Sequence, residues 1–199
     1  AFQFAINAVL VSLVLIVSFQ YRKVLNADPG YNYSNLVYET FPSYDQTKMT
    51  AIAGALRQLP EVEMVSECVQ DQALAFYNGQ QAMVNIMGVD DNFARMTRIQ
   101  KILYGDGDFS LQAANLEYGV PGIRLAQTLG MGARWDGFLK IYAPQREGQL
   151  TDMASPADGF VTDSLISPGV VFAVNQAKYD RDYLITSIAF ARRLFFRQG

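Results

Sequence analysis

The distribution of hydrophobic and polar positions separates an apolar leading segment from a mixed remainder. Residues 1–21 carry no charge and are almost all apolar. About 20 such residues suffice to cross a bilayer, so this run predicts a membrane-spanning helix that continues as a stalk to about Ala27. Gln3 and Asn7 would share a helix face that meets another helix. A secretory signal would need a basic start, which is missing; a buried core helix is the remaining alternative.

The pattern that follows predicts a strand–helix–strand–strand order. Asn35–Phe41 and Glu61–Val69 are typical of strands, whereas Gln46–Leu59 has apolar residues at helical spacing and ends before a proline. Two alternating runs flank Asn78-Gly79, a dipeptide that favours a type I′ hairpin turn. This order predicts an α+β unit in which a helix covers one face of a sheet.

The remainder of the chain predicts a mostly β second lobe. Short helices are expected at 90–96, with N-capping aspartates, and between Pro121 and Gly130. An amphipathic helix is expected at 189–196. The other expected elements are strands at 138–144, 170–176 and 183–188, a long loop at 146–169 and a turn at 177–182. The resulting division is 1–27 for the spanning helix and stalk, 28–130 for the α+β lobe, and 131–199 for the mainly β lobe with its closing helix.

Composition limits the chemistry that these 199 residues can carry. The formal net charge is −3, so there is no basic surface for nucleic acid. The chain has no histidine, which excludes Ser-His-Asp triads, Cys-His dyads and histidine-based zinc sites within it. Its one cysteine, Cys68, cannot form an internal disulfide and is expected to be a small buried hydrophobe.

One stretch comes close to the ligand spacing of an EF-hand. The sequence DGDFSLQAANLE offers Asp106, Asp108, Ser110 and Glu117. Leu111 occupies the position where the sharp turn of a calcium loop requires glycine. We therefore interpret this stretch as a solvated turn that leads into a strand.

Three further patterns have simple structural explanations. GMGARWDG at 130–137 lacks the third glycine of a dinucleotide site and is interpreted as a helix C-cap with a turn; no P-loop motif is present. Asn32–Ser34 fits a glycosylation acceptor, a tripeptide common by chance. The paired aspartates at 90 and 91, 106 and 108, and 180 and 182 are expected to stabilise turns. No catalytic, cofactor-binding or metal-ligating residue, and no cofactor, is assigned.

Four segments in order resemble the FtsX-like permeases of ABC transporters. The segment 2–38, FQFAINAVLVSLVLIVSFQYRKVLNADPGYNYSNLVY, resembles their first spanning helix and stalk. The segment 59–93, LPEVEMVSECVQDQALAFYNGQQAMVNIMGVDDNF, resembles the lipoprotein-releasing LolC/LolE-type branch, in which a helix leads to P-x-V, a hairpin and a G-V-D step. The segments 122–148 and 168–195 resemble later parts of the same periplasmic domain.

The resemblance implies a MacB-like periplasmic domain, with an incomplete α+β porter lobe at 28–130 and a mainly β sabre lobe at 131–199. It implies a permease subunit without catalysis of its own, located in the bacterial inner membrane with most of the chain in the periplasm. The implied partners are a cytoplasmic ATP-binding subunit, a second permease subunit, membrane lipid, and a lipoprotein, peptide or amphiphile as cargo. Phe2, Phe4 and Leu10 would line an apolar surface between two subunits. The family has four spanning helices and further porter strands, so the chain is expected to be part of a longer protein.

Two alternatives remain from other functional classes. A membrane-anchored scaffold or signalling subunit would regulate a periplasmic partner such as a cell-wall hydrolase. An anchored hydrolase is the least favoured, because no histidine or nucleophile motif supports it.

Overall fold

The computed structural model describes residues 37, 39–41, 45–144 and 159–196. The predicted spanning helix and stalk at 1–27 and the acceptor Asn32–Ser34 lie outside these ranges. Within the described parts of the chain, no helix has the length and apolar character needed to cross a membrane. The elements in chain order are α2 (Gln46–Leu56), β1 (Cys68–Tyr77), β2 (Gln80–Val89), α3 (Asn92–Thr97), the 3₁₀ turn η1 (Ile99–Ile102), β3 (Leu103–Gly105), β4 (Gln112–Ala113), β5 (Leu116–Glu117), β6 (Val120–Pro121), α4 (Ile123–Thr128), β7 (Leu139–Pro144), β8 (Phe160–Leu165), β9 (Val170–Phe172), α5 (Ala177–Asp182), β10 (Tyr183–Ser187) and α6 (Ile188–Phe195).

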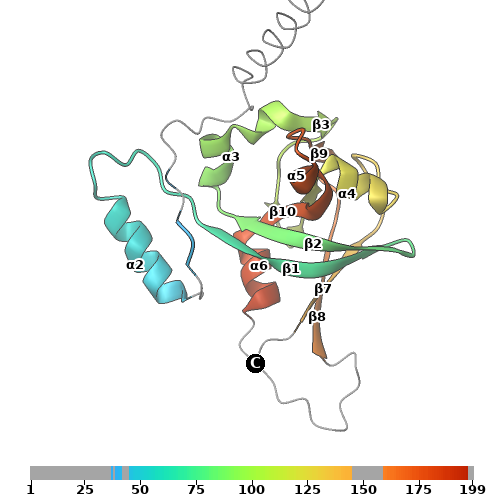
Figure 1. Ribbon diagram of the computed structural model, residues 1–199, viewed down its shortest axis with the longest axis horizontal. Coiled ribbons are helices and arrows are strands. Elements are labelled where there is room, and N and C mark those ends of the chain that lie inside the picture. The colour runs from blue at the N-terminus through green and yellow to red at the C-terminus, as the bar shows by residue number, and fades with distance from the viewer. Residues whose placement is uncertain (1–36, 38, 42–44, 145–158, 197–199) are drawn as a thin grey trace, which may run out of the picture.

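A six-stranded sheet with the order β6-β10-β2-β1-β7-β8 organises the fold (Figure 1). Its centre is the β1–β2 hairpin, paired from Cys68 opposite Val89 to Tyr77 opposite Gln80. The hairpin turn has positive φ at both central residues, 45° at Asn78 and 81° at Gly79. This geometry belongs to a type I′ turn, so the predicted hairpin is confirmed. The α+β fold class is confirmed as well.

The two edges of the sheet are joined by the chain that follows β8. Ile166 forms a parallel bridge with Tyr118, just before β6. The Gly119 amide donates to the Ile166 carbonyl at 3.1 Å, and the Ile166 amide donates to the Glu117 carbonyl at 3.0 Å. The sheet therefore curls around a shared interior, and strands from both sides of residue 130 contribute to it. The division into two lobes at that residue stays a prediction.

Two hydrophobic clusters fill the fold. The larger combines alternate sheet residues with side chains of α4 and α6, among them Ile86, Leu125, Leu139, Leu184 and Phe190, which are all 0% exposed. Strand alternation explains the members that come from the sheet, because successive side chains of a strand point to opposite faces. The smaller cluster contains Val89, Ile99, Val120, Val170, Phe172, Tyr183 and Ile185, and is covered by side chains of α3, η1 and β3.

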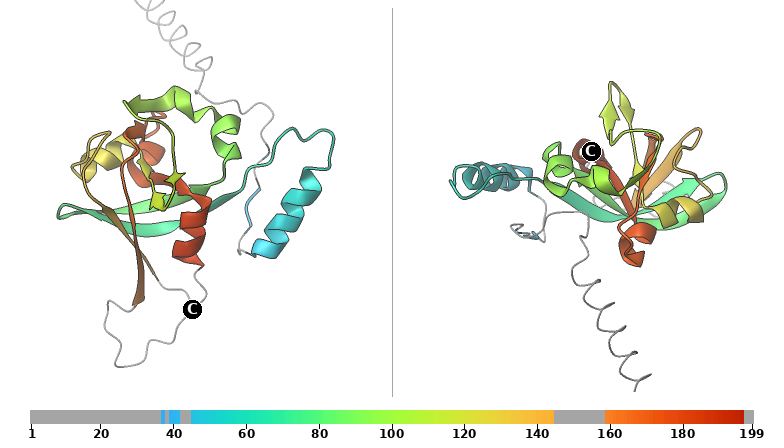
Figure 2. Two further views of the ribbon diagram at one scale, coloured as in Figure 1. Left: turned by 180° about the vertical axis from the view of Figure 1, so that it is seen from behind. Right: turned by 90° about the horizontal axis from the view of Figure 1, so that it is seen from above.

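The expected helix at 46–59 forms as α2 but ends at Leu56. Its N-cap is Asp45, whose carboxylate accepts a hydrogen bond from the Lys48 amide at 3.1 Å. This hydrogen bond is the main cause of a lowered pKa for Asp45. Figures 1 and 2 show α2 standing apart from the sheet, to which it is connected by the stretch that leads into β1.

Four other expectations about local structure are wrong at least in part. Residues 61–67 are not in a strand, since β1 begins at Cys68. The described residues of the predicted strand at 35–41, which are 37 and 39–41, are not in a strand either. The expected loop at 146–169 contains β8, whose backbone pairs with β7. The expected turn at 177–182 is the helix α5.

The unexpected helix α5 carries a buried aspartate that binds the loop before it. Asp180 is 3% exposed, and its carboxylate accepts a hydrogen bond from the Val174 amide at 2.8 Å. This bond holds the preceding loop, in which Asn175 has a φ of 58°. The segment's polar composition alone is equally typical of a turn.

Candidate functional site: an entry junction beside an open hollow

The chain enters the sheet through residues 65–67, which we call the entry junction. The Asp90 carboxylate fixes this segment from the end of β2. The Ser66 hydroxyl donates to one carboxylate oxygen at 2.6 Å, and the Glu67 amide donates to the other at 2.9 Å. The Asp90 amide in turn donates to the Glu67 carbonyl at 3.3 Å.

The same carboxylate caps the following helix. The amides of Asn92 and Phe93 each donate to the Asp90 carboxylate at 3.2 Å. Sequence analysis predicted N-capping aspartates here; the capping side chain is Asp90, whereas Asp91 occupies the N-cap position without a side-chain cap bond. The Asn92 side-chain amide also donates to the Val65 carbonyl at 2.9 Å. Hydrogen bonds to a charged acceptor are among the stronger ones, so Asp90 ties the entry junction, β2 and α3 together.

Helix α6 is fastened to the entry junction by an ion pair. The Arg192 guanidinium donates to the Glu67 carboxylate at 2.7 Å. The two side chains are 27% and 24% exposed, so water screens this pair only in part. The two residues are 125 positions apart in the sequence. The pair therefore joins the start of β1 to the closing helix.

A second set of polar contacts holds the start of α6. The Ser187 hydroxyl donates to Glu117 at 2.8 Å and accepts from the Phe190 amide at 3.0 Å, as an N-cap does. Arg193 bridges Asp163 at 2.9 Å and Glu117 at 3.2 Å. Desolvation is the largest single influence on the pKa of Arg193 and lowers it. The hydrogen bonds and charges of Asp163 and Glu117 together outweigh desolvation, so the pKa of Arg193 is raised. These contacts connect α6 to β8 and β5.

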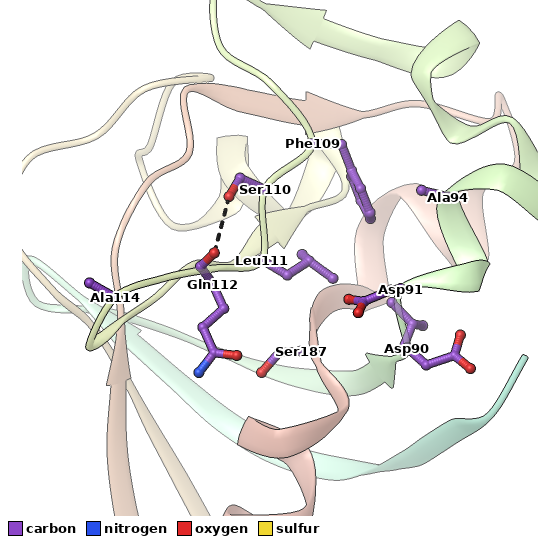
Figure 3. Close-up of a pocket in the computed structure, with 10 residues that line it drawn as sticks. Asp90, Asp91, Ala94, Phe109, Ser110, Leu111, Gln112, Ala114 and Ser187 are labelled. Atoms are coloured by element: carbon purple, nitrogen blue, oxygen red, sulfur yellow. Dashed lines mark hydrogen bonds between the residues drawn. The ribbon is translucent and has the colours of Figure 1, made fainter.

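An open hollow of about 630 Å³ lies beside the entry junction (Figure 3). Its lining includes Asp90 and Asp91 at the start of α3, Ser187 before α6, and residues 109–112 and 114 on the loop that carries the β4–β5 hairpin. In Figure 3 the Asp91 carboxylate faces the hollow, whereas the Asp90 carboxylate points away from it. The Asp91 residue is exposed, and its carboxylate makes no hydrogen bond or ion pair with any described residue.

The other acidic residues singled out in the sequence have separate positions. Asp106 and Asp108 are exposed in the turn before the β4–β5 hairpin, whereas Glu117 binds Ser187 and Arg193. Asp182 pairs with Arg181 at 2.8 Å, away from the contact made by the buried Asp180. No group of three or more potential metal ligands occurs among the described residues.

Cys68 does not behave as the expected buried hydrophobe. The residue is exposed at the start of β1. Desolvation around the sulfur, with a smaller contribution from the Asp90 charge, raises the pKa of the Cys68 thiol to about 11. At neutral pH the thiol is therefore protonated, and its nucleophilicity is low.

Comparisons with known proteins give a partial likeness in structure but no match in sequence. No model of a known protein family matches the sequence, and no curated protein does. A solved structure that the chain resembles is the extracellular domain of the noncanonical ABC-type transporter YknZ from Gram-positive bacteria. The TM-score is 0.47 at 10% sequence identity, and the match covers 73% of this chain. It spans 65% of the YknZ domain.

Proposed function

We propose that the chain is part of a permease subunit of an ABC transporter, and that its folded part passes conformational change from the membrane to a cargo outside the cytoplasm. The subunit itself would contribute no catalytic group. Its partners would be a cytoplasmic ATP-binding subunit and a second permease subunit, and its cargo a lipoprotein, peptide or amphiphile. The bacterial inner membrane would hold the apolar segment at 1–21.

The observation that carries this proposal is the role of the G-V-D step, Gly88-Val89-Asp90. In the sequence this step follows the hairpin, as it does in the lipoprotein-releasing permeases that the segment resembles. In the structure Asp90 accepts four hydrogen bonds, two of them from the entry junction. A displacement of the leading segment can move a folded domain only if the connection between them is firm. Asp90 secures the last part of that connection, where the chain enters the sheet.

An apolar surface on the β1–β2 hairpin supports a cargo with apolar groups. Met83 is 61% exposed and Phe76 is 36% exposed. Leu74 on β1 lies opposite Met83 on β2 and opposite Tyr142 on β7. The side chains of Leu74, Met83 and Tyr142 therefore lie on one face of the sheet. Exposed apolar surface of this kind is typical of a binding site.

Purification of the full-length protein from its own membrane tests the proposal. We expect an ATP-binding subunit to co-purify in detergent, with an ATPase rate that responds to the permease. A complex that lacks any ATP-binding subunit in differently tagged preparations would contradict the proposal. If depletion leaves export unchanged but alters cell-wall hydrolysis, the scaffold alternative is favoured instead.

A variant of the hairpin surface tests the cargo interaction. We expect Met83→Glu to reduce cargo release about tenfold, because a carboxylate on the exposed face penalises contact with apolar groups. The matched control is Gln80→Glu, which places the same charge on an exposed position of β2 that lies on the other face of the sheet. Equal effects of the two substitutions, with stability unchanged, would show that the apolar surface is not used.

A further inference from the structure

Strand β8 lies at one end of the strand order of the six-stranded sheet, with β7 as its neighbour (Figure 1). Just after the strand, the Ile166 amide and carbonyl point away from β7 and form hydrogen bonds of 3.0 and 3.1 Å with the segment 117–119. Backbone groups of every second residue in a strand point to the same side. The amides and carbonyls of Phe160, Thr162 and Ser164 therefore point to this outer edge as well.

The part of the edge formed by β8 itself is open in the described structure. Phe160 and Thr162 are exposed, and their backbone groups on this side make no hydrogen bond with any described residue. The Ser164 amide donates to the Asp163 carboxylate at 2.8 Å. A row of unpaired donors and acceptors such as this one is able to pair with a strand of another chain.

The usual protections of an edge strand are missing from β8. Natural edges are commonly blocked by lysine, proline or a bulge. The strand FVTDSL contains neither lysine nor proline, and it pairs with β7 residue for residue without a bulge. Its one charged side chain, Asp163, is bound by Arg193 at 2.9 Å. Phe160 at the start of the edge is 48% exposed, so the edge presents an aromatic ring and no unpaired charge.

We propose that β8 pairs antiparallel with β8 of a second copy of this chain, in a register centred on Thr162. Thr162 then lies opposite Thr162 of the second copy, Phe160 opposite Ser164, and Val161 opposite Asp163. Threonine pairs and aromatic rings beside small side chains are favourable across strands, and no like charges face each other. A register centred on Asp163 would place two carboxylates opposite each other, which disfavours it. The strand is therefore complementary to itself in charge and in shape.

The pairing has a consequence for the exposed apolar surface of the β1–β2 hairpin. Two antiparallel strands that pair around a two-fold axis keep the same faces of their sheets on the same side. The surfaces that contain Phe76 and Met83 in the two copies then belong to one continuous sheet face. This inference rests on the proposed function in that the second copy is the second permease subunit, and it identifies the strand through which the two subunits meet.

Single cysteines in the full-length protein test the register in native membranes. Cys68→Ser removes the exposed native thiol. In that background we expect Thr162→Cys to form a disulfide-linked dimer under mild oxidation, because directly opposite residues have Cα atoms about 5.5 Å apart. Ser164→Cys is the matched control on the same edge. Its two cysteines lie about 13 Å apart in this register, so its cross-linked fraction should be roughly tenfold lower.

A charged variant tests the pairing through a separate reporter. Differently tagged copies that carry Phe160→Cys and Ser164→Cys should cross-link to each other. Adding Thr162→Lys to both copies should lower the yield about fivefold, because two lysines then face each other. Gln72→Lys adds the same charge at an exposed position of β1 and should leave the yield unchanged.

Three outcomes would overturn the proposal: no cross-link at Thr162, equal cross-linking at Thr162 and Ser164, or a cross-link from Thr162 to a different protein only. Co-purification of an ATP-binding subunit is measured independently of these cysteines. A missing cross-link in a preparation that contains the ATP-binding subunit sinks the pairing alone. A cross-linked dimer without that subunit sinks the transporter proposal alone.

Discussion

Helices α2 and α6 were both predicted from apolar spacing, but only α6 concentrates its apolar residues strongly on one face, and the two helices have opposite surroundings. In α6, Phe190, Ala191, Leu194 and Phe195 are at most 5% exposed, and both arginines are engaged by carboxylates. In α2 the described side chains are exposed or partly buried except Ala53, and Ile52 and Leu56 are 36% and 39% exposed. Helical spacing of apolar residues therefore predicts a helix, whereas the concentration of those residues on one face, strong in α6 and weak in α2, indicates which helix packs on the sheet. The described structure joins α6 to the sheet and leaves α2 outside it.

Core truncation in the two helices should give the largest difference. We expect Phe190→Ala to lower the free energy of unfolding by about 3–5 kcal/mol, because it opens a cavity in the larger cluster. Ile52→Ala should cost only about 0.5 kcal/mol, since much of that side chain is already in water. Chemical denaturation of the full chain in detergent measures both values. Similar losses for the two variants would mean that α2 has a buried face.

The reactivity of Cys68 probes the start of β1, where the region that contains α2 gives way to the sheet. Because the pKa of the thiol is raised to about 11 from a reference of 9.0, its thiolate fraction at pH 8 is about a hundredfold lower than that of an ordinary thiol. We expect alkylation by iodoacetamide at pH 8 to be slower by about that factor than in the urea-unfolded chain. The thiol should also favour folding below pH 9, and this contribution should decline as the pH rises toward 11. Equal alkylation rates in the folded and unfolded chain would contradict the raised pKa.

Removal of the Asp90 carboxylate should have the next largest effect. Asp90→Ala leaves four donors without their acceptor, so we expect the free energy of unfolding to fall by about 2 kcal/mol. Asp91→Ala is the neighbouring control and should change it by less than about 0.5 kcal/mol. Urea unfolding of the full chain followed by circular dichroism compares the two. An equal change in both variants would mean that Asp90 does not hold the entry junction.

The sequence predicted the parts of the fold that depend on local pattern. The hairpin followed from Asn78-Gly79, and α6 from its apolar spacing. Strand β8 was missed because polar residues alternate only weakly in Phe160–Leu165, and the strand depends on pairing with β7. Because β7 ends at Pro144 and β8 begins only at Phe160, no short turn signal in the sequence indicates that they pair.

The candidate site was less predictable than the fold. The two adjacent aspartates suggested capping, but their different orientations decide which one caps α3 and which one faces the hollow. Arg192 and Arg193 were visible at the end of an apolar helix, yet their partners Glu67 and Glu117 lie 125 and 76 positions away. Such pairs form only once the sheet has closed.

Hydrogen exchange in the intact protein tests most directly the claim that the entry junction, and not α2, is firmly joined to the sheet. Amides that donate to the Asp90 carboxylate, those of Glu67, Asn92 and Phe93, should be protected to a similar degree as the strands of the β1–β2 hairpin. Amides of α2 should exchange much faster, because opening this exposed helix disrupts few buried contacts. Fast exchange at Glu67 together with slow exchange throughout α2 would contradict the account.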